Sequence, residues 1–177
     1  MNATQTIWAF TLAVAIVAAW SDWRTRRIPN WLTVAGVILG VGLHTVIAGR
    51  RGAAASLEGV GLALALLLPL VLLRALGAGD WKLMGALGAF LGPWMVLFVM
   101  LASFLISGFM AILMMIQAKR VKATLRNLVT LIRGFVSFGL RTNPQISLDN
   151  PGLLKLPFGV AAAIGTVVCF AATRWGL

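Results

Sequence analysis

Apolar runs long enough to cross a lipid bilayer follow one another along most of this chain, and they limit what it can fold into. The first runs from Ile7 to Trp20, the second from Trp31 to Ala48 and the third from Leu57 to Leu76. Of the 177 residues, 60% are hydrophobic and only 11% are charged, against about 25% charged in a soluble domain. We therefore predict one all-α integral membrane domain over residues 1–177, and we exclude a soluble or a disordered chain.

The next apolar stretch, residues 83–117, is too long to be one span. As a continuous helix it would reach about 52 Å, whereas the hydrocarbon core of a bilayer is about 30 Å thick. Gly92-Pro93 interrupts this stretch, so we divide it into a short span and a longer one. The six transmembrane helices predicted in this way cover about residues 5–20, 31–48, 57–76, 81–92, 94–117 and 156–175.

The distribution of basic residues favours six spans over five. The chain carries 15 Lys and Arg against 4 Asp and Glu, and basic residues concentrate in cytoplasmic loops. With six spans, only Arg50, Arg51 and Arg174 lie opposite the side that holds all the others. We therefore predict a multi-pass protein of the plasma (inner) membrane with both termini outside the cytoplasm. Because the membrane accounts for the positive charge, we predict no nucleic-acid partner.

Residues 118–150 form the longest stretch between predicted spans. Apolar residues recur there at helical spacing, and Lys122, Arg126 and Arg133 alternate with them. This pattern is typical of a basic amphipathic helix that lies on the cytoplasmic membrane face. We expect it to bind anionic lipid headgroups; docking of a substrate is the alternative.

Only four acidic residues occur, and they are Asp22, Glu58, Asp80 and Asp149. Ionisable groups near the membrane core are costly, so each needs a structural or a functional reason. Glu58 begins the third predicted span, where a carboxylate suits a helix N-terminus, and Asp149 lies in a polar turn. Asp22 closes the first span and Asp80 opens the fourth, so both are expected at one depth on the cytoplasmic face.

Two carboxylates at such a boundary have the chemistry of an aspartic protease. They cannot both ionise easily when they are close together, so one holds a proton while the other stays charged. The charged carboxylate can take a proton from water and the protonated one can polarise a carbonyl. The simpler interpretation is that Asp22 and Asp80 are unrelated and pair with Arg27 and Lys82.

The residues before Asp80 would let another peptide backbone, such as that of a substrate, come close to its carboxylate. Gly77 and Gly79 precede it, and glycine permits a close approach and unusual backbone angles, although a helix end would explain the same glycines. The single cysteine, Cys169, and the single histidine, His44, both lie in apolar runs, where we expect them to pack. They are too few for a zinc site, and we predict neither a metal nor a cofactor.

Three segments of the chain resemble the type IV prepilin peptidases, which are GxGD-type membrane aspartic endopeptidases. Residues 77–82, Gly-Ala-Gly-Asp-Trp-Lys, are similar to the GxGDxK motif of that family. Residues 22–30, which end in Ile-Pro-Asn, resemble its first aspartate segment, and residues 157–159, Pro-Phe-Gly, are similar to its third element. The resemblance extends over about residues 5–172. It implies that Asp22 and Asp80 are catalytic, with supporting residues Gly77, Gly79, Lys82, Arg27, Pro29, Asn30, Pro157, Phe158 and Gly159.

The resemblance also implies a substrate and a subgroup. The substrate would be a prepilin or pseudopilin with a short basic leader, a glycine and a long apolar helix, cleaved after the glycine at the cytoplasmic face. Members that also N-methylate their product carry paired CxxC sequences after the first span, whereas the short segment between Trp20 and Trp31 has no cysteine. The chain is therefore most similar to the compact peptidases of tight-adherence (Flp) pili, with archaeal preflagellin peptidases as related enzymes. No N-methylation is expected.

Two alternatives without catalysis stay open at this point. In a small transporter or channel component, Asp22 and Asp80 would bind a coupling ion, although such proteins often have repeated halves and none is visible here. In a pilus-assembly scaffold, the same residues would do no chemistry.

Overall fold

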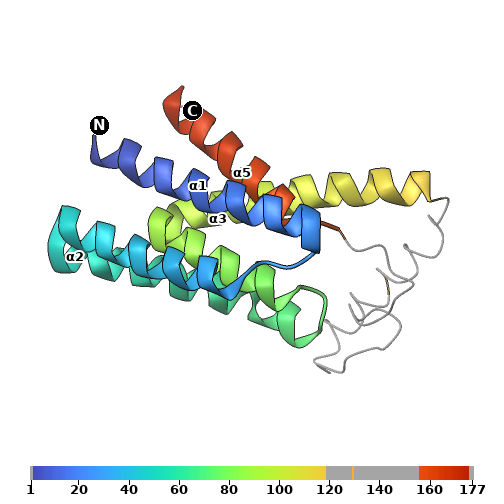
Figure 1. Cartoon of the computed structure of the whole chain (residues 1–177), viewed down its shortest axis with the longest axis horizontal. Helices are drawn as coiled ribbons and strands as arrows, with labels where there is room; N and C mark the ends of the chain where they lie inside the picture. The colour runs from blue at the N-terminus through green and yellow to red at the C-terminus, as the bar shows by residue number, and fades with distance from the viewer. Residues whose placement is uncertain (1, 119–128, 130–155, 176–177) are drawn as a thin grey trace.

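The structure, a computed structural model, describes residues 2–118, residue 129 and residues 156–175. The elements in these residues are the helices α1 (Ala3–Thr25), α2 (Asn30–Leu72), α3 (Ala78–Gln117) and α5 (Phe158–Arg174) (Figure 1). The first three are long and apolar enough to cross a membrane, and α5 is a shorter apolar helix. The predicted all-α fold is confirmed for this part of the chain. The predicted amphipathic segment, 118–150, lies outside the described residues except at positions 118 and 129.

Both long helices are interrupted by non-helical residues. In α2 the backbone leaves the helical region at Ala48 and at Gly49, which has φ 59°. In α3 it does so at Gly92, which has φ 72°, directly before Pro93. Glycine adopts such positive φ values without the steric cost that other residues pay. The breaks expected after residue 48 and at Gly92-Pro93 are therefore present, while the passage of each stretch through a bilayer stays a prediction.

The helix that contains most of the third predicted span, residues 57–76, differs from that span at both ends. The helix resumes directly after Gly49 and not at residue 57, because Arg and Ala are good helix formers even where charge lowers the hydropathy. It ends at Leu72 and not at residue 76. There Arg74 adopts φ 54°, and the Ala75 N–H donates to the Leu70 carbonyl, which is the hydrogen-bonding pattern of a helix C-terminus closed by a left-handed residue.

The two stretches of α2 enclose the first stretch of α3. Along residues 30–48, Gly36 lies against Ala86 and Gly40 against Ala89, so the two stretches run in the same direction. Beyond Gly49 the order reverses, because Ser56 bonds to Ala89 whereas Leu64 contacts Gly85. Residues 30–72 therefore fold back on themselves around the start of α3 (Figure 1).

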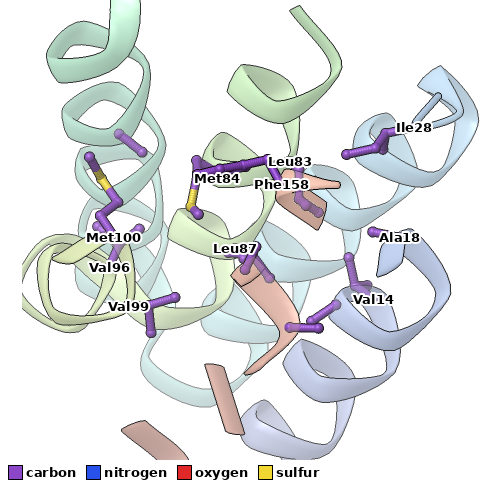
Figure 2. Packing of buried hydrophobic residues seen from close by; sticks show 14 of the residues in the cluster. Val14, Ala18, Ile28, Leu83, Met84, Leu87, Val96, Val99, Met100 and Phe158 are labelled. Carbon is purple, nitrogen blue, oxygen red and sulfur yellow. The ribbon is translucent and has the colours of Figure 1, made fainter. Parts of the chain in front are cut away.

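Small residues and a compact apolar cluster hold the helices together. Gly59 and Gly88 meet backbone to backbone, since a Cβ on either would collide with the carbonyl oxygen of the other. Such small-residue contacts are typical of helices that pack in membranes. The core beneath the site end is shown in Figure 2, where Val14, Leu83, Leu87 and Phe158 come from three different helices. Many large apolar side chains are exposed on the outside, as expected of a surface in contact with lipid.

Candidate active site

Residues from α1, α3 and α5 meet at one end of the helix bundle. The end of α1, the connection between α1 and α2, and the starts of α3 and α5 all lie there (Figure 1). Each of the three sequence segments singled out above contributes to this end, although they are far apart in the chain. The structure therefore brings the predicted site residues into one neighbourhood.

Asp22 lies near the C-terminus of α1 and is only 6% exposed. One of its carboxylate oxygens, Oδ2, accepts a hydrogen bond of 2.8 Å from the backbone N–H of Gly159. Arg26 ends the helix in a left-handed conformation with φ 54°, and its N–H donates to the Asp22 carbonyl. The positive charge of Arg26 also acts on the Asp22 carboxylate. A buried carboxylate thus has a backbone donor on one side and a cation nearby.

Asp80 lies in the first turn of α3, which begins after the N-cap Gly77. The backbone N–H of Gly77 donates to the Asp80 carboxylate. This is the second half of a capping box, in which the third helical residue reaches back to the N-cap. A carboxylate in the first turn also interacts favourably with the helix dipole. The local sequence therefore orients Asp80 before any contact from another helix is added.

Asp22 and Asp80 are close enough to interact electrostatically, although 58 positions separate their numbers in the sequence. Their neighbourhoods also touch, because a Cβ on Gly79 would lie 3.4 Å from the Cβ of Ile28 in the α1–α2 connection. The two aspartates therefore lie in one neighbourhood and are not placed independently of each other. Two interacting carboxylates at a mostly buried site can share one proton, since ionising both is costly.

The connection between α1 and α2 is held against the site by polar contacts. The hydroxyl of Ser21 donates to the carbonyl of Arg27 at 2.8 Å. Pro29 is the N-cap of α2, and Asn30, the first residue of that helix, accepts a 3.0 Å hydrogen bond from Lys82 Nζ. The bond between Lys82 and Asn30 thus links the two aspartate segments, whereas Arg27 contributes its backbone carbonyl to a contact within the first segment.

Pro157, Phe158 and Gly159 connect the start of α5 to the same end. Pro157 is the N-cap of α5, and the ring of Phe158 packs against that of Phe104, with their centroids 5.5 Å apart. A Cβ on Gly159 would lie 2.9 Å from the Cβ of Asp22 and 3.1 Å from its Oδ2. Only a residue without a side chain allows the α5 backbone to donate to Asp22 at this distance.

Sequence reasoning missed two residues of this neighbourhood. Arg26, and not Arg27, is the arginine whose charge acts on Asp22; the position of a helix C-cap would have distinguished them. The indole N–H of Trp81 donates to the Leu64 carbonyl at 2.8 Å, a contact that the aromatic composition of the chain does not reveal.

The remaining acidic and metal-binding candidates do not join the site within the described ranges. Glu58 is exposed on α2 beside Gly59, whose contacts are with Gly88 and Gly92 near the kink of α3. Asp149 lies outside the described residues. In residues 2–118, 129 and 156–175, no three His, Cys, Asp or Glu side chains are grouped so that they could hold a metal ion.

Comparison with known proteins gives one match. A family model described as the type IV leader peptidase family matches residues 9–112, more than half of the chain. The matched region contains both aspartates, whereas the 157–159 element lies beyond it. No curated protein and no solved structure matches the chain.

Proposed function

The chain belongs to the type IV leader peptidase family, and we propose that Asp22 and Asp80 are its catalytic pair. In this proposal the protein is a membrane aspartic endopeptidase that removes the short basic leader from prepilins or pseudopilins at the cytoplasmic membrane face. The observation that carries the proposal is the placement of the two carboxylates at one end of the bundle, on two different helices (Figure 1), where they are close enough to interact electrostatically. Membership of a peptidase family accords with this chemistry.

In the proposed reaction the pair holds one proton. The ionised carboxylate takes a proton from a water molecule while the protonated carboxyl polarises the scissile carbonyl. The hydroxide oxygen bonds to the carbonyl carbon, and the tetrahedral intermediate collapses when the amide nitrogen receives a proton and the C–N bond breaks. The products are the leader with a new carboxylate and the mature protein with a new amine. No metal or cofactor takes part.

The contacts of Asp22 support this role. A nucleophile-activating carboxylate must be held in one orientation, because small misplacements of a catalytic group cost about 100-fold in rate. The Gly159 N–H fixes one oxygen of Asp22, Oδ2, in position. The Gly77 N–H donates to the Asp80 carboxylate in a similar way.

The proposed substrate has a basic leader, a glycine and then a long apolar helix. Its helix would lie in the lipid beside the exposed apolar surface of the bundle, and its extended leader junction would reach the aspartate pair. The enzyme and the leader are both basic, so we propose that anionic lipid headgroups lie between them. The short form of the chain favours a substrate of the Flp, tight-adherence class.

We also propose that the product is not N-methylated. A methyl-donor site needs an enclosed pocket of several hundred Å³ with well-placed polar groups. The connection between α1 and α2 is only residues 26–29 in the structure. It leaves no place there for the cysteine-containing insertion of the bifunctional enzymes.

The test is cleavage by the purified protein in lipid vesicles. The substrate would be a synthetic Flp-type prepilin with a basic leader, a glycine and an apolar helix, incubated with a chelator and separately with the methyl donor S-adenosylmethionine. We expect one product, cut after the glycine and without a methyl increment in its mass. A transporter, a channel component or an inactive scaffold would leave the substrate intact. A methylated product would contradict the proposal that this chain only cleaves.

A further inference from the structure

The kink in α3 leaves backbone carbonyls without their usual helical donors. In a continuous helix the N–H of residue 93 would donate to the carbonyl of Ala89, but Pro93 has no N–H. The adjacent Gly92 lies outside the helical region, with φ 72° and ψ 179°, so the ladder of helical bonds is interrupted there. A buried carbonyl without a hydrogen-bond donor costs free energy. The carbonyls at the kink therefore need other donors.

The donors at this kink come from α2. The Ser56 hydroxyl donates to the Ala89 carbonyl at 2.6 Å, and Ser56 is fully buried. The other buried hydroxyls whose bonds are known, such as Ser103, donate to a carbonyl one turn earlier in their own helix. Ser56 is different because its bond crosses between helices and satisfies the oxygen that Pro93 cannot.

His44 forms a hydrogen bond with the next carbonyl along α3, that of Phe90. Its Nε2 lies 2.7 Å from the Phe90 oxygen. Because a carbonyl oxygen can only accept, Nε2 carries a proton in this contact. His44 precedes the bend of α2 and Ser56 follows it, so the two stretches of α2 hold the end of the same helical stretch from two sides.

The stretch that is held in this way carries Asp80 at its other end. We call residues 78–91 the Asp80 segment. Its first turn is also tied to α2, through the Trp81 indole bond to the Leu64 carbonyl. Between these ends, the residues from Leu83 to Phe90 are all buried. A buried helix fixed at both ends has little freedom to shift along or rotate about its axis.

We propose that His44 and Ser56 are positioning residues, which hold the kinked end of the Asp80 segment and thereby set where Asp80 lies relative to Asp22. The proposal rests on the proposed function, in which that pair does the chemistry. It gives the single histidine of the chain a role in catalysis through geometry, without contact with the substrate.

Kinetics of the full chain in vesicles, with the synthetic prepilin described above, give the first measurement. His44→Phe keeps a planar ring but removes the N–H, and Ser56→Ala removes the hydroxyl. We expect kcat to fall about ten- to hundredfold in each, with little change in KM because the substrate is still bound. His44→Gln, which retains an N–H donor at similar reach, should recover most of the loss. Ser103→Ala is the matched control, since it removes a buried hydroxyl that bonds within its own helix, and it should keep the parent kcat.

A second measurement reads the position of the segment without catalysis. In a Cys169→Ala background, Ile28→Cys and Gly79→Cys place two thiols whose Cβ atoms would be 3.4 Å apart, close to the mean of about 3.8 Å in disulfides. We expect oxidation to form this disulfide readily in the parent, more slowly after His44→Phe or Ser56→Ala, and readily again after His44→Gln or Ser103→Ala.

The two measurements separate the possible failures. Unchanged disulfide formation in His44→Phe and Ser56→Ala would overturn the positioning role, whatever happens to kcat. Parent-like kcat in both variants would also overturn it. If the parent itself does not cleave the substrate, the proposed function fails, and the disulfide rates still decide whether His44 and Ser56 position the segment.

Discussion

At the scale of single residues, the site depends on how closely the α5 backbone approaches Asp22. Gly159 donates its N–H to Oδ2 at 2.8 Å, and this contact fixes the orientation of a buried carboxylate. The donor is a backbone N–H, which other residues also have. Glycine is needed at position 159 because a Cβ there would take the space between the α5 backbone and Asp22.

Gly159→Ala should therefore reduce cleavage while the protein still folds. The new Cβ would lie 2.9 Å from the Cβ of Asp22, so either Asp22 or the start of α5 must shift. We expect kcat to fall about ten- to hundredfold, measured as the initial rate of leader removal. Gly108→Ala is the control, because a Cβ there meets nothing within 4 Å. Equal rates for the two variants would show that this approach is not needed for catalysis.

At the scale of helices, the Asp80 segment is positioned by a hairpin of α2 around it. Gly59 and Gly88 meet backbone to backbone in this packing. Membrane helices gain little from hydrophobic burial against one another, so close packing of small residues and hydrogen bonds between helices contribute much of their association. The stability of the hairpin should therefore be sensitive to one methyl group at this point.

Gly59→Ala should lower the thermal stability of the protein in detergent. Its Cβ would collide with the Gly88 carbonyl, and overpacking of this kind costs about 1–3 kcal/mol. Gly61→Ala, two positions along the same helix, meets nothing within 4 Å and should gain up to about 1 kcal/mol from its lower chain entropy. The midpoint of thermal unfolding measures both. A midpoint for Gly59→Ala at or above that of Gly61→Ala would contradict the packing described here.

Much at this scale could be predicted from the sequence, for identifiable reasons. The break at Gly92-Pro93 was predictable because proline and glycine both have local backbone requirements. The restart of α2 directly after Gly49 was not, because hydropathy drops at Arg50 and Arg51 although helix propensity does not. The bonds of Gly159 to Asp22 and of His44 to Phe90 join residues far apart in sequence, and no local pattern specifies such pairs.

At the scale of the whole molecule, the candidate site is at one end of the bundle and the bend of α2 is at the other. Asp22 and Asp80 lie at the first end, whereas Arg50 and Arg51 follow the bend at Gly49. The predicted orientation in the membrane therefore places the site in the cytoplasm and these two arginines outside. Leader cleavage at the cytoplasmic face requires this orientation.

Thiol labelling of intact cells tests the orientation. In a Cys169→Ala background, a cysteine at Arg51 should react with a membrane-impermeant reagent added outside, and one at Arg24 should react only after permeabilisation. Both side chains are exposed, so access to the reagent depends on the side of the membrane. The opposite pattern would place the aspartate pair outside the cytoplasm and contradict the proposed site of cleavage.

The most direct test of the central claim is the initial rate of leader removal by Asp22→Asn, Asp80→Asn and the double variant. If the two carboxylates act as one unit, each single change should lower the rate by about 1,000-fold or more, and the double change should be no worse than either single one. Glu58→Gln, at an exposed position beside the kink end of the bundle, should keep the parent rate. Substantial cleavage by either single variant, or losses that multiply in the double variant, would contradict an aspartate pair as the catalytic centre.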